Sequence, residues 1–361
     1  LKLFGLGTAR RDGAMAAVLG VEALGPGPWP TEDPFLFAVH HDDRFPPGGP
    51  DLGPHRSLLR GRNIGADFGH ADWNMYHGET VPGFPKHPHR GFETVSVVRH
   101  GCIDHTDSLG CAGRFGGGDV QWMTAGRGIS HTEMFPLIDA KAENRVELFQ
   151  IWLNLPRARK MAAPSFKMLW GEQLPRIRSE DSQGRKVDIT LIAGALEGLA
   201  PPSPPPASWA SEPEGGLAIW TGRLDPGAAW EVPPGPAGAN RAVYLFGPGA
   251  KAASVDGRPL RGECKVKLRA DVAARIAAGD RETEFLLLQA RPIGEPVVQH
   301  GPFVMTSREE IRQAFADYQR TGFGEWPWPS DSVVHAREEG KFAKYADGHV
   351  ERPHSENIVA A

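Results

Sequence analysis

The sequence predicts an all-β protein, either a barrel or a sandwich, and two observations favour this class. Glycine and proline, 44 and 33 of the 361 residues, exceed ordinary usage and favour a fold with many turns over long helices. Short β-rich runs recur between these turns, which is typical of strands. The clearest runs are FETVSVV (92–98), VELFQIWLNL (146–155), KVDITLIAG (186–194), LAIWTGRL (217–224), RAVYLFG (241–247) and TEFLLLQA (283–290).

A proline-rich stretch divides these runs into two groups of similar number. It reads LEGLAPPSPPPASWASEPEGG and spans residues 196–216. Its prolines lack amide donors and favour an extended conformation, so the stretch is typical of a loop or an interdomain connection. We therefore expect two β domains.

The segment SREEIRQAFADYQR, residues 307–320, is the clearest predicted helix. Ser307 and Glu310 have the spacing of a capping box, in which each side chain bonds a free backbone amide of the first turn. One apolar stripe is formed by Ile311, Ala314, Phe315 and Tyr318. DVAARIAAG, residues 271–279, is a candidate for a second, short helix.

Charge and cysteine content exclude several classes of protein. The net charge of −4 gives no basic footprint for direct nucleic-acid binding, and no apolar run approaches the ~20 residues that span a bilayer. Cys102, Cys111 and Cys264 form no CxxC pair, which suits a reducing compartment. Asp12 and Gly13 interrupt any signal-like core at the start of the chain. We expect a cytoplasmic protein.

Two pairs of polar residues carry the chemistry. His87 and His89 in GFPKHPHRG are two residues apart, so in a strand they project to the same face. His131 and Glu133 in GISHTEM repeat this spacing after a glycine-rich turn. Three imidazoles and one carboxylate suit a first-row divalent metal such as Fe(II) with open positions.

The choice of carboxylate stays open at this point. Glu93 shares strand parity with His87 and His89, so spacing alone permits it as a ligand in place of Glu133. The donor set also does not separate Fe(II) from manganese, nickel, copper or zinc. His105 and Asp107 have the same two-residue spacing, but we interpret them as a loop anchor.

Several segments closely resemble the pirin family of the cupin superfamily. They are, in family order, GFPKHPHRGFETVS, DSLG, GGGDVQWMTAGRGISHTEM, FQIWLNLP and PVVQHGPFVMTSREEI. The resemblance runs from DPFLFAVHH (33–41) to about Phe323. It implies a bicupin, two β-barrel (double-stranded β-helix) domains with a short C-terminal helix, and one iron in the N-terminal barrel.

Position by position, the resemblance implies the metal ligands His87, His89, His131 and Glu133, and makes Glu93 a supporting residue. It implies an N-terminal metal-binding cupin domain at 1–165, a metal-free cupin domain at 166–323 and a polar tail at 324–361. The sequence agrees with a metal-free second domain, because no histidine occurs between His131 and His300.

One segment departs from the family. The connection near residues 43–80, before the first histidine pair, is much longer than usual. It is either a lid over the metal or a surface excursion, and the sequence does not decide between them.

The resemblance implies two functions of different classes. One is a quercetin 2,3-dioxygenase-like activity, in which iron, dioxygen and a flavonol or similar aromatic enol meet at the site. A carboxylate near the metal would accept the substrate proton; Glu133 would do so only if it can leave the metal, and Glu93 is the reserve base. The other is a non-catalytic, redox-sensing regulator or transcriptional cofactor that binds a protein partner.

Overall fold

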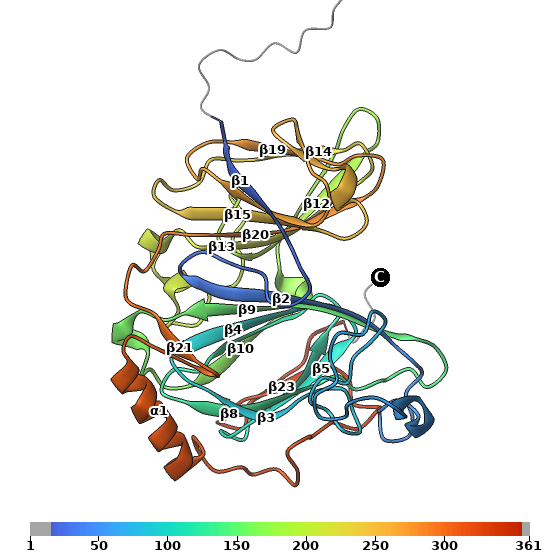
Figure 1. Ribbon diagram of the computed structural model, residues 1–361, viewed down its shortest axis with the longest axis vertical. Coiled ribbons are helices and arrows are strands. Elements are labelled where there is room, and N and C mark those ends of the chain that lie inside the picture. Colours follow the sequence, from blue (N-terminus) through green and yellow to red (C-terminus); the bar gives the residue numbers. More distant parts are fainter. Residues whose placement is uncertain (1–15, 356–361) are drawn as a thin grey trace, which may run out of the picture.

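The computed structural model describes residues 16–355, and in it two β-rich domains lie one above the other (Figure 1). Each is a cupin domain made of two facing antiparallel sheets rather than one closed barrel. The first 15 residues, which include the predicted break at Asp12 and Gly13, lie outside the described part. Within residues 16–355, no helix is long and apolar enough to cross a membrane.

The N-terminal domain contains a five-stranded and a six-stranded sheet. The first has the order β10 (Ser165–Leu169), β7 (Val120–Thr124), β4 (Phe92–His100), β9 (Asn144–Asn154) and β2 (Phe35–Phe45). The second has the order β24 (Val350–Glu351), β23 (Phe342–Lys344), β6 (Ala112–Gly116), β5 (Cys102–Asp107), β8 (Ile129–Met134) and β3 (Gly83–His89).

The C-terminal domain pairs a seven-stranded sheet with a four-stranded one. The larger has the order β1 (Val18–Ala23), β18 (Cys264–Leu268), β15 (Asn240–Phe246), β20 (Thr283–Ala290), β13 (Ala218–Leu224), β12 (Lys186–Ala193) and β11 (Arg176–Glu180). The smaller has the order β14 (Ala229–Val232), β19 (Ala274–Ala277), β16 (Ser254–Val255) and β17 (Arg258–Pro259).

The remaining elements are short. A hairpin is formed by β21 (Val298–His300) and β22 (Phe303–Met305), and α1 (Arg308–Thr321) follows it. The 3-10 helices are η1 (Arg56–Leu59), η2 (Arg157–Arg159), η3 (Gly171–Gln173), η4 (Trp209–Ser211), η5 (Pro213–Gly215) and η6 (Ala250–Ala252).

All six predicted strand runs are strands, but the predicted helix in DVAARIAAG is wrong. Residues Ala274–Ala277 of that segment form β19, in which Ala274 and Ile276 are buried and Arg275 is exposed. This two-residue alternation is the strand period, and pairing with β14 and β16 decides the conformation of an alanine-rich segment that local propensity leaves ambiguous.

The predicted helix is confirmed as α1. The Ser307 side chain accepts a hydrogen bond from the Glu310 amide at 3.2 Å and so caps the first turn. Glu310 reaches back one residue further than in a standard capping box, because its Oε2 accepts from the amide of Thr306 at 2.9 Å. The apolar stripe packs on Phe303 and Phe323, which fixes α1 against the outside of the N-terminal domain.

Three segments pair with a sheet that lies outside the predicted domain range to which each of them belongs. Strand β1, near the N-terminus, pairs with β18 of the C-terminal domain, and β10 pairs with β7 of the N-terminal domain. The polar tail pairs through β23 with β6, and buried Lys341 donates to Asp119 Oδ2 at 3.0 Å. The predicted domain limits at residues 165 and 323 stay a prediction. Strands β1, β10 and β23 are the segments that pair across these limits.

An apolar layer joins the two domains. Val95 and Phe149 from the N-terminal domain pack in one cluster with Tyr244 and Leu286 from the C-terminal domain. Trp29 stacks on Tyr244 with a ring separation of 5.7 Å. Because burial of apolar area is the main stabilising contribution to such contacts, we expect the domains to hold a fixed relation.

Candidate metal centre

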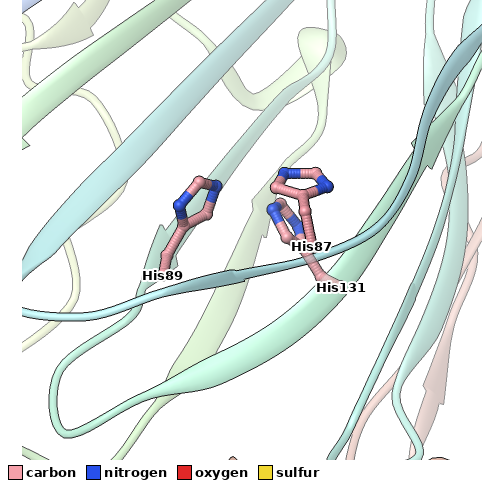
Figure 2. A group of neighbouring side chains, drawn as sticks. All are labelled: His87, His89 and His131. Carbon is pink, nitrogen blue, oxygen red and sulfur yellow. The ribbon is translucent and has the colours of Figure 1, made fainter. Parts of the chain in front are cut away.

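Three histidines meet on the inner face of the six-stranded sheet. His87 pairs directly with His131 across the antiparallel strands β3 and β8, and His89 follows on the same face of β3. The ring of His87 lies 4.8 Å from that of His89 and 4.4 Å from that of His131. Figure 2 shows the three rings turned toward one another. Strand parity therefore placed the His87–His89 pair correctly.

The three rings have the geometry and the protonation state of metal ligands. Their candidate ligand nitrogens all lie within 4.8 Å of one another. Burial lowers the pKa of His87 to about 4, and burial and neighbouring imidazoles hold the pKa values of His89 and His131 well below the usual range. All three rings are therefore neutral near pH 7, which is the form that binds metals.

The hydrogen bonds of these rings leave nitrogens without a partner. His87 Nδ1 lies 2.8 Å from the carbonyl oxygen of Pro85, which fixes the proton on Nδ1 and leaves Nε2 with a free lone pair. His131 is fully buried, yet neither of its ring nitrogens has a hydrogen-bond partner within residues 16–355. A buried polar atom without a partner costs folding free energy, and a bound metal ion would remove that cost. The three histidines therefore fit a divalent metal ion.

Glu133 lies next to this group without belonging to it. Its Oε2 is 3.9 Å from His131 Nε2 and accepts a hydrogen bond of 2.8 Å from Gln150 Nε2. Its Oε1 lies 3.1 Å from Ser96 Oγ. Burial raises the pKa of the carboxyl group. The structure thus brings Glu133 beside the three imidazoles, and a role as fourth ligand is part of the proposal below.

Glu93 is not brought to the histidines, and the parity argument for it is wrong. That argument treats His87 to Glu93 as one strand, but Gly91, with φ +85°, separates β3 from β4, which belong to different sheets. Glu93 shares its face of β4 with Val95, in the interdomain layer, and accepts from Thr124 Oγ1 at 2.7 Å. A reserve base at Glu93 therefore lacks the contact it needs.

His105 and Asp107 form the expected loop anchor, with a second feature that the sequence did not indicate. His105 Nε2 lies 3.2 Å from Asp107 Oδ2, and Asp107 Oδ1 accepts from the amides of Leu109 and Cys111. The His105 ring also lies 5.5 Å from the His131 ring. The anchor therefore fixes a wall of the metal centre as well as a turn.

His87 and His89 line a large pocket that has both apolar and polar walls. Its cavity volume is about 760 Å³, which is in the range of small-molecule sites. Its apolar lining includes Phe37, Phe84, Phe135, Leu148 and Trp152. The polar groups His87, His89, Glu133 and Gln150 line the same space. An aromatic pocket with a few convergent polar groups suits a planar organic molecule that carries oxygen atoms.

Comparison with known proteins agrees with this arrangement. The family model described as Pirin matches residues 63–153, and the model described as Pirin C-terminal cupin domain matches residues 219–324. A pirin-like protein of Caulobacter vibrioides is 37% identical over 249 residues, which cover 67% of this chain and 80% of that protein. The chain belongs to the pirin family.

Mouse pirin is 34% identical over 273 residues, which cover 72% of this chain and 84% of that protein. Among solved structures, a quercetin 2,3-dioxygenase from Acinetobacter baumannii superposes with a TM-score of 0.65 and 27% identity. That superposition covers 86% of this chain and 99% of the Acinetobacter protein. The pirin relationship therefore extends over both cupin domains.

The insertion near 43–80 forms part of the pocket of this pirin. Gly65, His77 and Glu79 from the insertion line the pocket, and Asp331 and Ser332 from the polar tail line it as well. The insertion is firmly packed, since Trp73, Met75 and Tyr76 are buried in the core of the N-terminal domain. It is therefore a wall of the site and more than a surface excursion.

Proposed function

We propose that this pirin is a metal-dependent dioxygenase that cleaves a flavonol or a similar aromatic enol. One non-haem Fe(II) would be held by His87, His89, His131 and Glu133. The observation that carries the proposal is that His87 and His89 line an aromatic pocket of about 760 Å³, while His131, buried beside them, has no hydrogen-bond partner among the described residues. The similarity to the Acinetobacter quercetin 2,3-dioxygenase supports the same reaction class.

The donor set suits an anionic substrate. Three neutral imidazoles and one carboxylate leave a divalent ion with one net positive charge, which favours a deprotonated enol oxygen. Bound Fe(II) supplies a Lewis acid and a redox centre with open positions for substrate and dioxygen. The protein supplies the remaining functions, namely binding, orientation and proton uptake.

Aromatic side chains would orient the substrate ring. Trp152 packs against Phe37 and Phe92, with ring separations of 4.4 and 4.1 Å, and against His89 at 5.1 Å. Its position is therefore fixed from three sides beside a candidate ligand. A planar substrate that stacks along this wall is desolvated and held in one plane near the histidines.

Glu133 would accept the proton of the substrate enol. Burial raises the pKa of its carboxyl group, whereas the charge of a bound metal ion would lower it, so Glu133 would act as the base only when it leaves the metal. Gln150 holds one of its two oxygens and Ser96 lies beside the other, so the orientation of the group is fixed.

Oxygen uptake tests this proposal. The purified protein is first analysed for its native metals, then loaded with Fe(II) and mixed with quercetin in an oxygen electrode. We expect equimolar consumption of flavonol and dioxygen that stops when the metal is removed by a chelator. If the iron-, manganese- and nickel-loaded proteins all show no flavonol-dependent uptake, the proposal is wrong and the non-catalytic alternative is favoured.

A further inference from the structure

A chain of hydrogen bonds runs from the pocket wall into the insertion. His41 of β2 lines the pocket, and its Nδ1 lies 2.7 Å from the hydroxyl oxygen of Tyr76. The Tyr76 hydroxyl in turn donates to Asp43 Oδ2 at 2.6 Å. Tyr76 is buried and has a left-handed backbone with φ +58°, which a tyrosine adopts only where its surroundings fix it.

The donors and acceptors of this chain determine the tautomer of His41. Asp43 Oδ1 also accepts from the amide and the side chain of Asn74, at 2.9 and 3.0 Å, and although burial raises the pKa of Asp43 to about 6, its carboxyl group is mainly ionised at pH 7. The single Tyr76 proton therefore goes to Asp43, and the Tyr76 oxygen accepts from His41. That assignment places the His41 proton on Nδ1.

The opposite nitrogen of His41 is then left with a free lone pair. Nε2 has no hydrogen-bond partner in the described part of the chain, although its residue lines the pocket. Burial and the neighbouring His40 lower the pKa of His41 to about 4. The ring is therefore neutral near pH 7, and it accepts a hydrogen bond from a phenol without removing its proton.

His41 lies apart from the metal centre within the same pocket. In the β2–β9 pairing, Val39 is opposite Gln150 and His41 is opposite Leu148. His41 and Gln150 are thus diagonal neighbours, with a typical backbone separation of about 7–8 Å. Since Gln150 bonds Glu133, the pocket offers two separate polar points with aromatic walls around them.

We propose that His41 selects substrates that carry a second hydroxyl group, remote from the reacting enol. Nε2 of His41 accepts a hydrogen bond from this phenolic hydroxyl, and Tyr76 and Asp43 are positioning residues that fix the tautomer. The inference rests on the proposed function, since it assumes that the enol lies at Glu133. The substrate class narrows to planar aromatics with hydroxyl groups at both ends.

Binding to the metal-free protein tests the proposal without any turnover. Dissociation constants are measured by fluorescence for 3-hydroxyflavone and for derivatives that add one hydroxyl, at position 7 or at position 4′. We expect one derivative to bind about 3- to 10-fold more tightly than 3-hydroxyflavone, the gain of one hydrogen bond. His41→Leu should abolish this preference and leave the affinity for 3-hydroxyflavone within about twofold.

Two further variants separate recognition from structure. Tyr76→Phe removes the group that fixes the tautomer and should reduce the preference while retaining 3-hydroxyflavone binding. His55→Gln changes an exposed histidine of the insertion that does not line the pocket, and it should keep the full preference. The melting temperatures of all variants show whether the contacts of His41 only stabilise the fold.

The outcomes also distinguish this inference from the proposed function. A His41-dependent preference without dioxygenase activity would support the binding role and contradict the enzyme. Turnover of flavonols with no such preference would overturn the role of His41 alone. A melting temperature that falls in His41→Leu while the preference persists would show a purely structural contact, and failure of every flavonol to bind would overturn the inference.

Discussion

The two cupin domains of this pirin share an architecture of two facing sheets, but the space between the sheets is a pocket in one domain and a packed apolar core in the other. In the N-terminal domain, His87 and His89 of the three grouped histidines and the carboxylate of Glu133 line a pocket of about 760 Å³. In the C-terminal domain, the corresponding space between the sheets is filled by an apolar cluster. Trp230 stacks on Phe285 at 5.5 Å and meets Trp220 at 6.3 Å.

A glycine shows how closely the C-terminal interior is packed. A Cβ atom on Gly222 of β13 would lie 2.2 Å from the ring of Phe285, so this ring sits where any other residue would place a side chain. The fold alone therefore does not create a site. The inward-facing residues decide whether the space between the sheets becomes a packed core or a reaction chamber.

Removal of one imidazole should have the largest effect. His131→Ala leaves two of the three grouped histidines, and we expect its metal content to fall from about one ion per chain to near zero, because two imidazoles and an adjacent carboxylate bind far more weakly. Elemental analysis of the purified protein measures this directly. A full complement of metal in His131→Ala would place the metal elsewhere.

Removal of an aromatic ring from the other interior should destabilise the fold and spare the metal. Phe285→Ala opens a cavity in the apolar cluster of the C-terminal domain, with an expected loss of about 3–5 kcal/mol in the free energy of unfolding. Urea denaturation measures the loss. Its metal content should equal that of the wild type, and a loss of metal under native conditions would show that the interiors are coupled.

Acid should weaken the polar contacts that join the domains. Arg99 donates to Glu147 of the N-terminal domain and to Glu284 of the C-terminal domain. Burial opposes ionisation of Glu147, but the His40 hydrogen bond and the charges of Arg99 and Arg145 prevail and lower its pKa to about 2. Since this pKa is depressed from 4.5, its stabilisation is complete above pH 4.5 and is lost as the pH falls toward 2.

The expected size of this contribution is roughly 3 kcal/mol, from the shift of the Glu147 pKa. Urea denaturation at pH 7 and pH 3 should detect a loss of about 2 kcal/mol from this contribution, because at pH 3 the folded-state carboxyl group is still largely ionised. Glu147→Gln should be destabilised at pH 7 and should lose less stability than the wild type between the two values. Glu143→Gln, which changes an exposed ion pair with Arg44, is the matched control and should behave as the wild type. Identical acid sensitivity in both variants would contradict the role of Glu147.

Loss of a supporting hydrogen bond should have the smallest effect. Gln150→Leu removes the donor that holds Glu133, and we expect metal affinity to fall about 10- to 100-fold in a chelator competition. Gln289→Leu is the matched change in the other interior, where Gln289 accepts from Arg241 at 2.7 Å. It should alter stability and leave metal affinity unchanged. Equal affinities in both variants would mean that Glu133 is not a ligand.

Local pattern predicted much of the fold. The two-residue period with bounding turns located six strands, and the capping residues located α1. Pattern did not predict that β1 pairs with β18, because that register joins residues about 245 positions apart and depends on tertiary packing. The misread β19 has the same cause, since its neighbours decide its conformation.

The sequence predicted those parts of the candidate site in which the residues lie two apart on one strand and therefore share a face. Parity brought together His87 and His89, and the same rule applied to His41 and Asp43 would have placed them on one face of β2. Parity failed at Glu93 because a left-handed glycine ends the strand first. The contact of Gln150 with Glu133 joins different sheets, so no spacing in the sequence indicates it.

Anomalous diffraction from crystals of the iron-loaded protein, recorded at the iron absorption edge, tests the central claim most directly. We expect one strong peak among the rings of His87, His89 and His131 and none in the apolar interior of the C-terminal domain. A peak in the C-terminal domain, or no peak at the three histidines, would contradict the claim that this protein has a single metal site and that it lies in the N-terminal domain.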